Sequence, residues 1–234
     1  SMKKISIIIS AIAAMFFAAE ANAQLGIGAG YNFETMTTKV SDSKSSDNLN
    51  GFYLEAYYGI PLAEGRWGAV GIQPGVRYSY FGKTDKSDEV LGFVTKTSLT
   101  EHYLDVPVNF RYSFKVATPV RVFAFAGPVF SFGLDSASKL AVSGHDKEYS
   151  VTSHNYSGKI VTKGDNISGS TTDTGIKDYG WFDLKIGLGA GVTLFDILDV
   201  KVGYNFGLLN RYTGDVDGYR LGTNVFTAGV AVNF

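Results

Sequence analysis

The sequence has few residues that could carry out catalysis. It contains three histidines, His102, His145 and His154, and no cysteine. Ser98 precedes His102 by four residues, and a serine close to a histidine is the arrangement expected of a nucleophilic hydrolase. Glu101 is next to His102, but neighbouring residues of a strand point to opposite sides, so these two do not form a relay. We predict no catalytic residues and keep His102 with Ser98 as the enzymatic alternative.

A second group of chemically capable residues lies further along the chain. It consists of His145, Asp146, Glu148 and His154, whose nitrogen and oxygen atoms are typical zinc ligands. Their spacing matches no known zinc site, so we interpret them as solvated loop residues and predict no metal and no cofactor. The absence of cysteine excludes thiolate metal sites and disulfide bonds.

Charged residues also occur at alternate positions within apolar segments. Because buried charges are tolerated only when they are paired, we expect these residues to form an ion-pair network inside the molecule. A gated path for protons or small ions is the alternative. The residues are Glu55, Arg77, Asp105, Arg111, Arg121, Asp183, Lys185 and Lys201.

The alternation has a period of two over most of the chain. In the first segment, apolar residues at odd positions from Leu25 to Phe33 alternate with glycine and asparagine. This pattern is typical of strands that face lipid on one side and the inside of a barrel on the other. Beyond residue 23 no apolar run is long enough for a membrane-spanning helix. We predict an all-β, antiparallel, up-and-down transmembrane β-barrel of about eight strands, within residues 25–33, 52–60, 70–80, 104–114, 120–134, 182–194, 200–208 and 226–234.

The connections between these segments alternate in length. Bacterial barrels have short periplasmic turns and long extracellular loops, and an even number of strands places both termini in the periplasm. Within 135–178, the segments 140–142, 149–152 and 159–162 have β character, so a ten-strand barrel or an extended hairpin is the alternative. An exposed strand edge there could capture partners by strand addition. The long connections are 34–50, 82–98, 135–178 and 209–220, and the short ones are 61–67, 115–119 and 195–199.

Some residues fit the strand pattern poorly. Phe123 and Phe125 share a strand face with Arg121, which a β-bulge would reconcile. Three prolines, at 74, 107 and 128, lie inside expected strands, where a missing N–H breaks a ladder bond. We predict that they occupy bulge or rim positions.

The first 23 residues have the features of a secretory signal peptide. Lys3 and Lys4 precede an apolar stretch, and Ala21-Asn22-Ala23 forms a small-residue cleavage site. We predict that residues 1–23 are removed and that 24–234 form an outer-membrane barrel in contact with outer-membrane lipid and lipopolysaccharide. The final residue, Phe234, is an aromatic of the kind read by the barrel assembly machinery.

The net charge bears on nucleic-acid binding, and the outward apolar faces bear on the choice of architecture. The formal net charge is −1, which gives no support for nucleic-acid binding. A soluble β-barrel or sandwich with an aromatic core is the alternative architecture, but it would need a second sheet to cover the outward apolar faces.

Several motifs resemble a known family. Tyr103-Leu104-Asp105-Val106-Pro107, Val122 to Pro128, Gly187 to Gly191 and Gly203 to Leu208 are similar to segments of the PorT-like outer-membrane β-barrel family of Bacteroides-type bacteria. The resemblance implies an outer-membrane barrel and allows a role in a secretion or transport machine. It provides no catalytic residues to transfer.

From these features we predict a non-enzymatic protein of the bacterial outer membrane. Its role would be to stabilise the envelope or to bind an extracellular ligand or envelope protein through the 135–178 segment. The alternatives are a lipid-modifying enzyme that uses His102 and a component of a secretion machine. Asp135-Ser136-Ala137 also resembles a short O-glycosylation motif.

Overall fold

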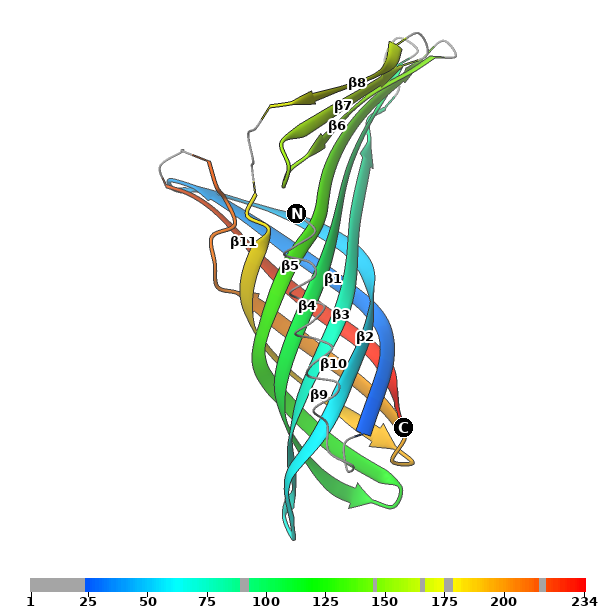
Figure 1. The fold of residues 1–234 in the computed structure, drawn as a ribbon, viewed down its shortest axis with the longest axis vertical. Helices are drawn as coiled ribbons and strands as arrows, with labels where there is room; N and C mark the ends of the chain where they lie inside the picture. The colour runs from blue at the N-terminus through cyan, green and yellow to red at the C-terminus, as the bar shows by residue number, and fades with distance from the viewer. Residues whose placement is uncertain (1–23, 89–92, 145–146, 165–166, 175–178, 215–217) are drawn as a thin grey trace.

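The computed structural model describes residues 24–88, 93–144, 147–164, 167–174, 179–214 and 218–234, and the expected signal peptide lies outside this part. The described residues form one antiparallel sheet of 11 strands (Figure 1). The strands are β1 (Gln24–Val40), β2 (Ser43–Gly65), β3 (Gly68–Lys86), β4 (Phe93–Ala117), β5 (Val120–Gly144), β6 (Lys147–His154), β7 (Lys159–Gly164), β8 (Ile167–Asp173), β9 (Phe182–Leu194), β10 (Leu198–Gly207) and β11 (Tyr219–Asn233).

Eight of these strands close into a barrel, which confirms the predicted architecture. The ring runs β1, β2, β3, β4, β5, β9, β10 and β11, and pairing of β11 with β1 completes it. Closure pairs every strand on both sides, as a bilayer requires. Within the described residues, the structure has no helix with the length and apolar character needed to cross a membrane.

The remaining three strands extend the barrel at one end. β5 pairs with β9 up to Phe132 and with β6 from Ala137 onward, and β7 and β8 follow in order. We call β6, β7, β8 and the adjoining residues 93–100 of β4 and 137–144 of β5 the blade (Figure 1). The three β pieces predicted in 135–178 are confirmed within β5, β6 and β7, whereas β8 was not predicted and no ten-strand barrel forms.

Two other segments that we expected to be loops are mostly strand. β1 and β2 continue as a hairpin to a two-residue turn at Ser41 and Asp42, and most of the described part of 82–98 belongs to β3 and β4. Paired threonine and serine residues, such as Thr37 and Ser46 with hydroxyl oxygens 3.3 Å apart, line the hairpin. Cross-strand pairs of this kind stabilise a ribbon without an apolar run.

The short connections are confirmed, and they lie together at the opposite end of the barrel. The turns are Arg66–Trp67, Thr118–Pro119 and Phe195–Ile197. The start of β1 and the C-terminus lie at this same end (Figure 1). We refer to the two ends as the short-turn end and the long-loop end.

The outward face of the ring is an apolar band. On β1 the outward residues change from Phe33 to Thr35, and on β4 from His102 to Thr100, so we place the long-loop limit of the membrane-spanning segments at Phe33 and His102. Exposed aromatic residues border the band, as expected at bilayer interfaces. They include Tyr31, Phe52, Phe130, Trp181, Phe206 and Phe226 toward the long-loop end, and Trp67, Phe114, Phe195 and Phe234 toward the short-turn end.

The expected bulge near Phe123 is wrong. The pairing of β5 with β9 is continuous from Val120 to Phe132, so Phe123 and Phe125 face the interior with Arg121. Phe123 is only 4% exposed. Phe81, on β3, is also an interior residue at 1% exposure. The interior therefore contains aromatic rings as well as charges.

The prediction for the three prolines is also wrong. The register shifts occur instead at Pro61/Ala63, His102/Tyr103 and Lys115/Ala117. Next to Pro107, for example, the register of β3 on β4 is unchanged, but the two pairs between Pro74–Val108 and Arg77–Asp105 are missing. Each proline therefore removes ladder pairs locally, because it has no N–H to donate, without displacing the strands.

Candidate functional site: the lumen and its two ends

The central part of the lumen holds a compact ion cluster. Arg77 donates to Glu55 Oε2 from Nε at 3.1 Å and from Nη2 at 2.8 Å, and Lys201 pairs with the other carboxylate oxygen. The side chains of Glu55 and Arg77 are 4% and 8% exposed. Beside them Ser79 donates to Asp105 at 2.9 Å. All of these residues lie at inward positions of their strands. β2, β3 and β4 are neighbours and provide Glu55, Arg77, Ser79 and Asp105, whereas Lys201 reaches them from β10 across the lumen.

A second cluster lies nearer the short-turn end. Arg111 binds both carboxylate oxygens of Asp199, at 2.6 and 3.2 Å, and donates to Thr193 at 2.7 Å. Tyr57 donates to the same carboxylate at 3.1 Å. The Arg111 guanidinium also lies over the Phe123 ring, 3.6 Å from its centroid. A two-bonded arginine–carboxylate pair with aromatic stacking is a rigid arrangement.

Three of the predicted network residues lie apart from these two clusters. Arg121 pairs with Asp196 in the β9–β10 turn at 2.9 Å, and both are more than a third exposed. Asp183 accepts a hydrogen bond from Thr223 at 3.0 Å. Lys185 lies with its ammonium 5.1 Å from the centroid of the Tyr103 ring. The eight predicted residues therefore belong to several separate groups along the barrel axis.

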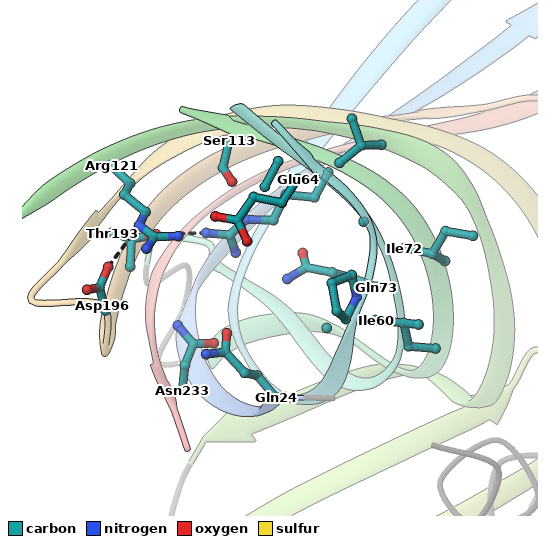
Figure 2. A pocket seen from close by; sticks show the side chains of 16 residues that line it. Gln24, Ile60, Glu64, Ile72, Gln73, Ser113, Arg121, Thr193, Asp196 and Asn233 are labelled. Carbon is teal, nitrogen blue, oxygen red and sulfur yellow. Dashed lines mark hydrogen bonds and ion pairs between the residues drawn. The ribbon is translucent and has the colours of Figure 1, made fainter. Parts of the chain in front are cut away.

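A pocket of about 260 Å³ opens at the short-turn end (Figure 2). Arg111 and Arg121 line it together with Glu64 from β2 and Gln73 from β3. Figure 2 shows the ion pair of Arg121 with Asp196 at its edge. The lining provides both hydrogen-bond donors and acceptors, so it can form hydrogen bonds with a small polar molecule. Both arginines already have carboxylate partners.

The opening at the long-loop end, which we call the mouth, is closed by a different group. Arg211, from the β10–β11 connection, is 1% exposed and donates to the Tyr156 hydroxyl at 2.7 Å. Its Nη2 lies 3.5 Å from Glu101 Oε1. Glu101 also accepts hydrogen bonds from Tyr103 at 2.7 Å and Ser136 at 2.9 Å. Arg211 therefore ties two connections of the long-loop end to the barrel wall.

An apolar cluster surrounds this ion pair. Its buried members come from five different strands, and aromatic residues of the loops pack against them. A core beyond the membrane band explains why the long strands hold their shape outside lipid. The buried members are Met36, Leu49, Phe81, Tyr103, Leu221 and Val225, and the packed residues are Leu99, Tyr179, Tyr212 and Tyr219.

The sequence reasoning missed four buried charged residues: Glu34, Glu101, Asp199 and Arg211. All are at most 1% exposed. For Glu34 and Asp199 a signal was present, since both continue the inward period of their strands beyond the limits we predicted. Arg211 lies in a connection with no strand period, so no pattern indicated its burial.

The residues of the enzymatic alternative lie on the outside of the barrel. His102 Nδ1 is 2.6 Å from the Tyr78 hydroxyl, and its ring packs edge-on against Tyr80. Ser98 instead accepts a hydrogen bond from Thr84 at 3.2 Å. Four residues of strand separate Ser98 from His102 by about 13 Å, so the two side chains do not form a catalytic pair. Glu101 points to the side of the strand opposite His102, as predicted.

The structure describes two of the four residues His145, Asp146, Glu148 and His154 of the possible loop metal site. His145 and Asp146 lie outside the described residues. His154 contacts Asp135 at 3.0 Å, and Glu148 pairs with Lys139 at 3.6 Å. Among the described residues, no group of three or more His, Cys, Asp or Glu side chains is arranged to hold a metal ion.

The glycosylation motif is not accessible. Ser136 is 0% exposed, and its hydroxyl lies between Glu101, to which it donates, and Asn155, which donates to it at 2.9 Å. A glycan could not be attached there in the folded protein. The structure gives Ser136 a different role, as part of the closure of the mouth.

A closed eight-strand ring with an apolar outer band and a charged, filled interior defines a transmembrane β-barrel of the bacterial outer membrane. The sequence agrees with this class. Residues 17–212 match the family model described as outer membrane protein beta-barrel domain, and the chain belongs to that family.

Solved structures with a similar fold come from several bacteria. Ail of Yersinia pestis, in complex with the heparin analogue sucrose octasulfate, is 12% identical with a TM-score of 0.41, over 91% of this chain and 99% of that one. Neisserial surface protein A is 14% identical with a TM-score of 0.35, over 90% and 97%. The outer membrane protease OmpT from Escherichia coli is 11% identical with a TM-score of 0.40, over 92% and 97%. No curated protein matches the sequence.

Proposed function

We propose that this chain is a non-enzymatic outer-membrane protein that binds a partner protein on the blade, outside the cell. The long-loop end then faces the exterior, and Gln24 and Phe234 lie on the periplasmic side. Two features support this orientation: bacterial barrels place their short turns in the periplasm, and the exposed aromatic Phe234 suits recognition by the assembly machinery. The band contacts outer-membrane lipid and lipopolysaccharide. The motifs from Tyr103 to Leu208 support a place within the PorT-like group.

The observation that carries the proposal is an apolar face on the blade, beyond the membrane band. Leu140 pairs with Val151, and Val142 pairs with Tyr149, on the side of the sheet that continues the lumen side of β5. Leu140, Tyr149 and Val151 are 47%, 43% and 42% exposed. Apolar patches that are exposed to water rather than lipid mark interaction sites.

The strand edge beside this face selects the kind of partner. Among the described residues, β8 pairs with β7 on one side only. An edge strand presents backbone N–H and C=O groups whose complement is another polypeptide in extended conformation. A lipid or a glycan would leave this edge unpaired. The apolar face and the edge together therefore favour a protein that covers the blade and adds a strand to it.

The test is site-specific photocrosslinking on living cells. A photoreactive residue in place of Leu140 should form an adduct with one protein, whereas the same residue at Lys139, on the opposite face, should not. Val151→Asp should abolish the adduct by placing a charge in the apolar face. Thr152→Asp, its neighbour on the other face of β6, should retain it.

Three results would contradict the proposal. These are the absence of any adduct from Leu140, an adduct from Lys139 alone, and an adduct that consists of lipopolysaccharide or of a second copy of this chain. Heat-modifiable migration on a gel verifies that each variant is folded.

A further inference from the structure

Glu34 has an unusual environment at the mouth. It lies on β1, one residue beyond Phe33 on the long-loop side of the membrane-spanning segment, and it is 0% exposed. Among the described residues, no N–H or O–H donor reaches either of its carboxyl oxygens. Burial of a carboxylate without hydrogen-bond donors disfavours its ionised form at this position.

Its neighbour Glu101 has the opposite environment. Burial alone would raise the pKa of Glu101, but Arg211 and the hydroxyl donors Tyr103 and Ser136 hold that pKa below its ordinary value. Burial, and then the negative charge of Glu101, raise the pKa of Glu34 to about 8, although Lys185 and Arg211 oppose this shift. Two adjacent carboxyl groups in such a site retain a single proton, which protonated Glu34 can donate to Glu101.

The charges of the lumen lead to the same conclusion. Among the described residues, the charged side chains that are at most 14% exposed include one more carboxyl group than cationic groups. A proton on Glu34 removes this excess. The carboxyl groups are Glu34, Glu55, Glu101, Asp105, Asp183 and Asp199, and the cations are Arg77, Arg111, Lys185, Lys201 and Arg211.

We infer that Glu34 and Glu101 share one proton at neutral pH and that loss of this proton loosens the closure of the mouth. The ionisable groups that face the pair are Tyr103 from β4, Lys185 from β9, Tyr156 from the β6–β7 turn and Arg211 from the β10–β11 connection. Once both carboxyl groups are ionised, they repel each other, and entry of water relieves that repulsion. Water that enters from the long-loop end meets Arg211, which is bonded to Tyr156 and lies against Glu101.

The direction of the pH effect follows from linkage. In the closed mouth Glu34 retains its proton up to a pKa of about 8, whereas in an open, hydrated mouth its pKa returns to the ordinary 4.5. Between these two values the closed state binds more protons than the open state. Closure is therefore strongest below pH 4.5 and weakens as the pH rises toward 8, with the open-to-closed ratio increasing by up to tenfold per pH unit.

A single introduced cysteine measures this opening, because the chain contains no cysteine. Leu49 lies opposite Glu34 and is 0% exposed. The reaction rate of Leu49→Cys with a maleimide is measured in protein folded in nanodiscs. Ser46→Cys, which is exposed on the same strand, is measured in the same way as a reference, and the first rate is divided by the second. The division removes the ordinary effect of pH on the thiol. The ratio should rise as the pH increases from 4.5 to about 8.

The controls identify the responsible proton. Glu34→Gln should make the ratio independent of pH, whereas Glu64→Gln, at the short-turn end, should leave the rise unchanged. A flat ratio in the parent protein, or a rise that persists in Glu34→Gln, would overturn the inference. If Leu49→Cys does not fold, Leu221→Cys, from the same apolar cluster, replaces it.

Infrared spectroscopy tests the proton directly. At neutral pH the folded protein should show the C=O stretch of a protonated carboxylic acid, and Glu34→Gln should remove it. Its absence from the parent spectrum would contradict the shared proton independently of any opening.

Discussion

Arg77 and Glu55 lie opposite each other on β3 and β2 and form a two-bonded ion pair inside the barrel. Lys201, from the far side of the ring, pairs with the remaining oxygen of Glu55. The pair therefore fastens β2 and β3 to β10 across the interior, in addition to the ladder bonds along the wall.

Removal of Arg77 should destabilise the barrel strongly. Arg77→Leu leaves Glu55 buried with Lys201 as its main ionic partner, and loss of one partner of a buried pair costs about 3–5 kcal/mol. The free energy of unfolding is measured by urea titration in lipid vesicles. Lys83→Ala is the matched control, because Lys83 pairs with Asp47 and Asp85 at the surface, and it should cost less than about 1 kcal/mol. Equal effects of the two variants would disprove the structural role of the lumen pair.

A side chain at Gly51 should also disturb the barrel. A Cβ atom there would lie 1.7 Å from the backbone oxygen of Tyr80, so β2 and β3 would have to separate. We expect Gly51→Ala to lower the free energy of unfolding by about 1–3 kcal/mol. At Gly222 a Cβ meets nothing within 4 Å, so Gly222→Ala should be nearly neutral in the same titration. A neutral Gly51→Ala would contradict the tight approach of the two strands.

The barrel should form without the blade. In a variant that lacks residues 137–178 and joins Ser136 to Tyr179 through a short Asn-Gly turn, all eight ring strands keep their partners. We expect heat-modifiable migration on a gel to persist. The variant should lose closure of the mouth, because Tyr156 is removed, and it should not form the adduct proposed for the blade. Loss of heat-modifiable migration would mean that the blade is part of the folding unit.

His102→Ala tests the enzymatic alternative. Because Ser98 is hydrogen-bonded to Thr84 and lies far along the strand, we expect the lipid A mass spectrum of expressing cells to be the same with the variant as with the parent chain. Stability should fall by no more than about 1 kcal/mol, the usual value of a single aromatic contact. A lipid A modification that depends on the parent chain and disappears with His102→Ala would establish an enzyme.

The eight-strand ring was predictable from the sequence because each of its strands alternates apolar outward residues with small or polar inward residues. Leu25 to Phe33 alternate without a slip, and lipid accepts only apolar side chains at the outward positions. The same rule placed Glu55, Arg77 and Lys201 inside. It could not show which charges meet, since the pairing of Arg111 with Asp199 depends on strands that are 88 residues apart in sequence.

The long-loop end was less predictable, for two physical reasons. Outside lipid the outward residues become polar, so Thr35 and Thr37 on β1 no longer contrast with their inward neighbours and the strand reads as a loop. Arg211 and Tyr156 are buried by the packing of connections against the barrel, which leaves no periodic pattern in the sequence.

β4 and β5 each continue as a single strand from the short-turn end into the blade, and their pairing resumes beyond one register shift at His102/Tyr103. A mechanical load applied by anything attached to the blade travels lengthwise along these two strands into the bilayer. Their mutual ladder would have to shear along most of its length at once rather than peel open pair by pair. β4 and β5 therefore form the longest continuous connection between the membrane-spanning ring and the blade.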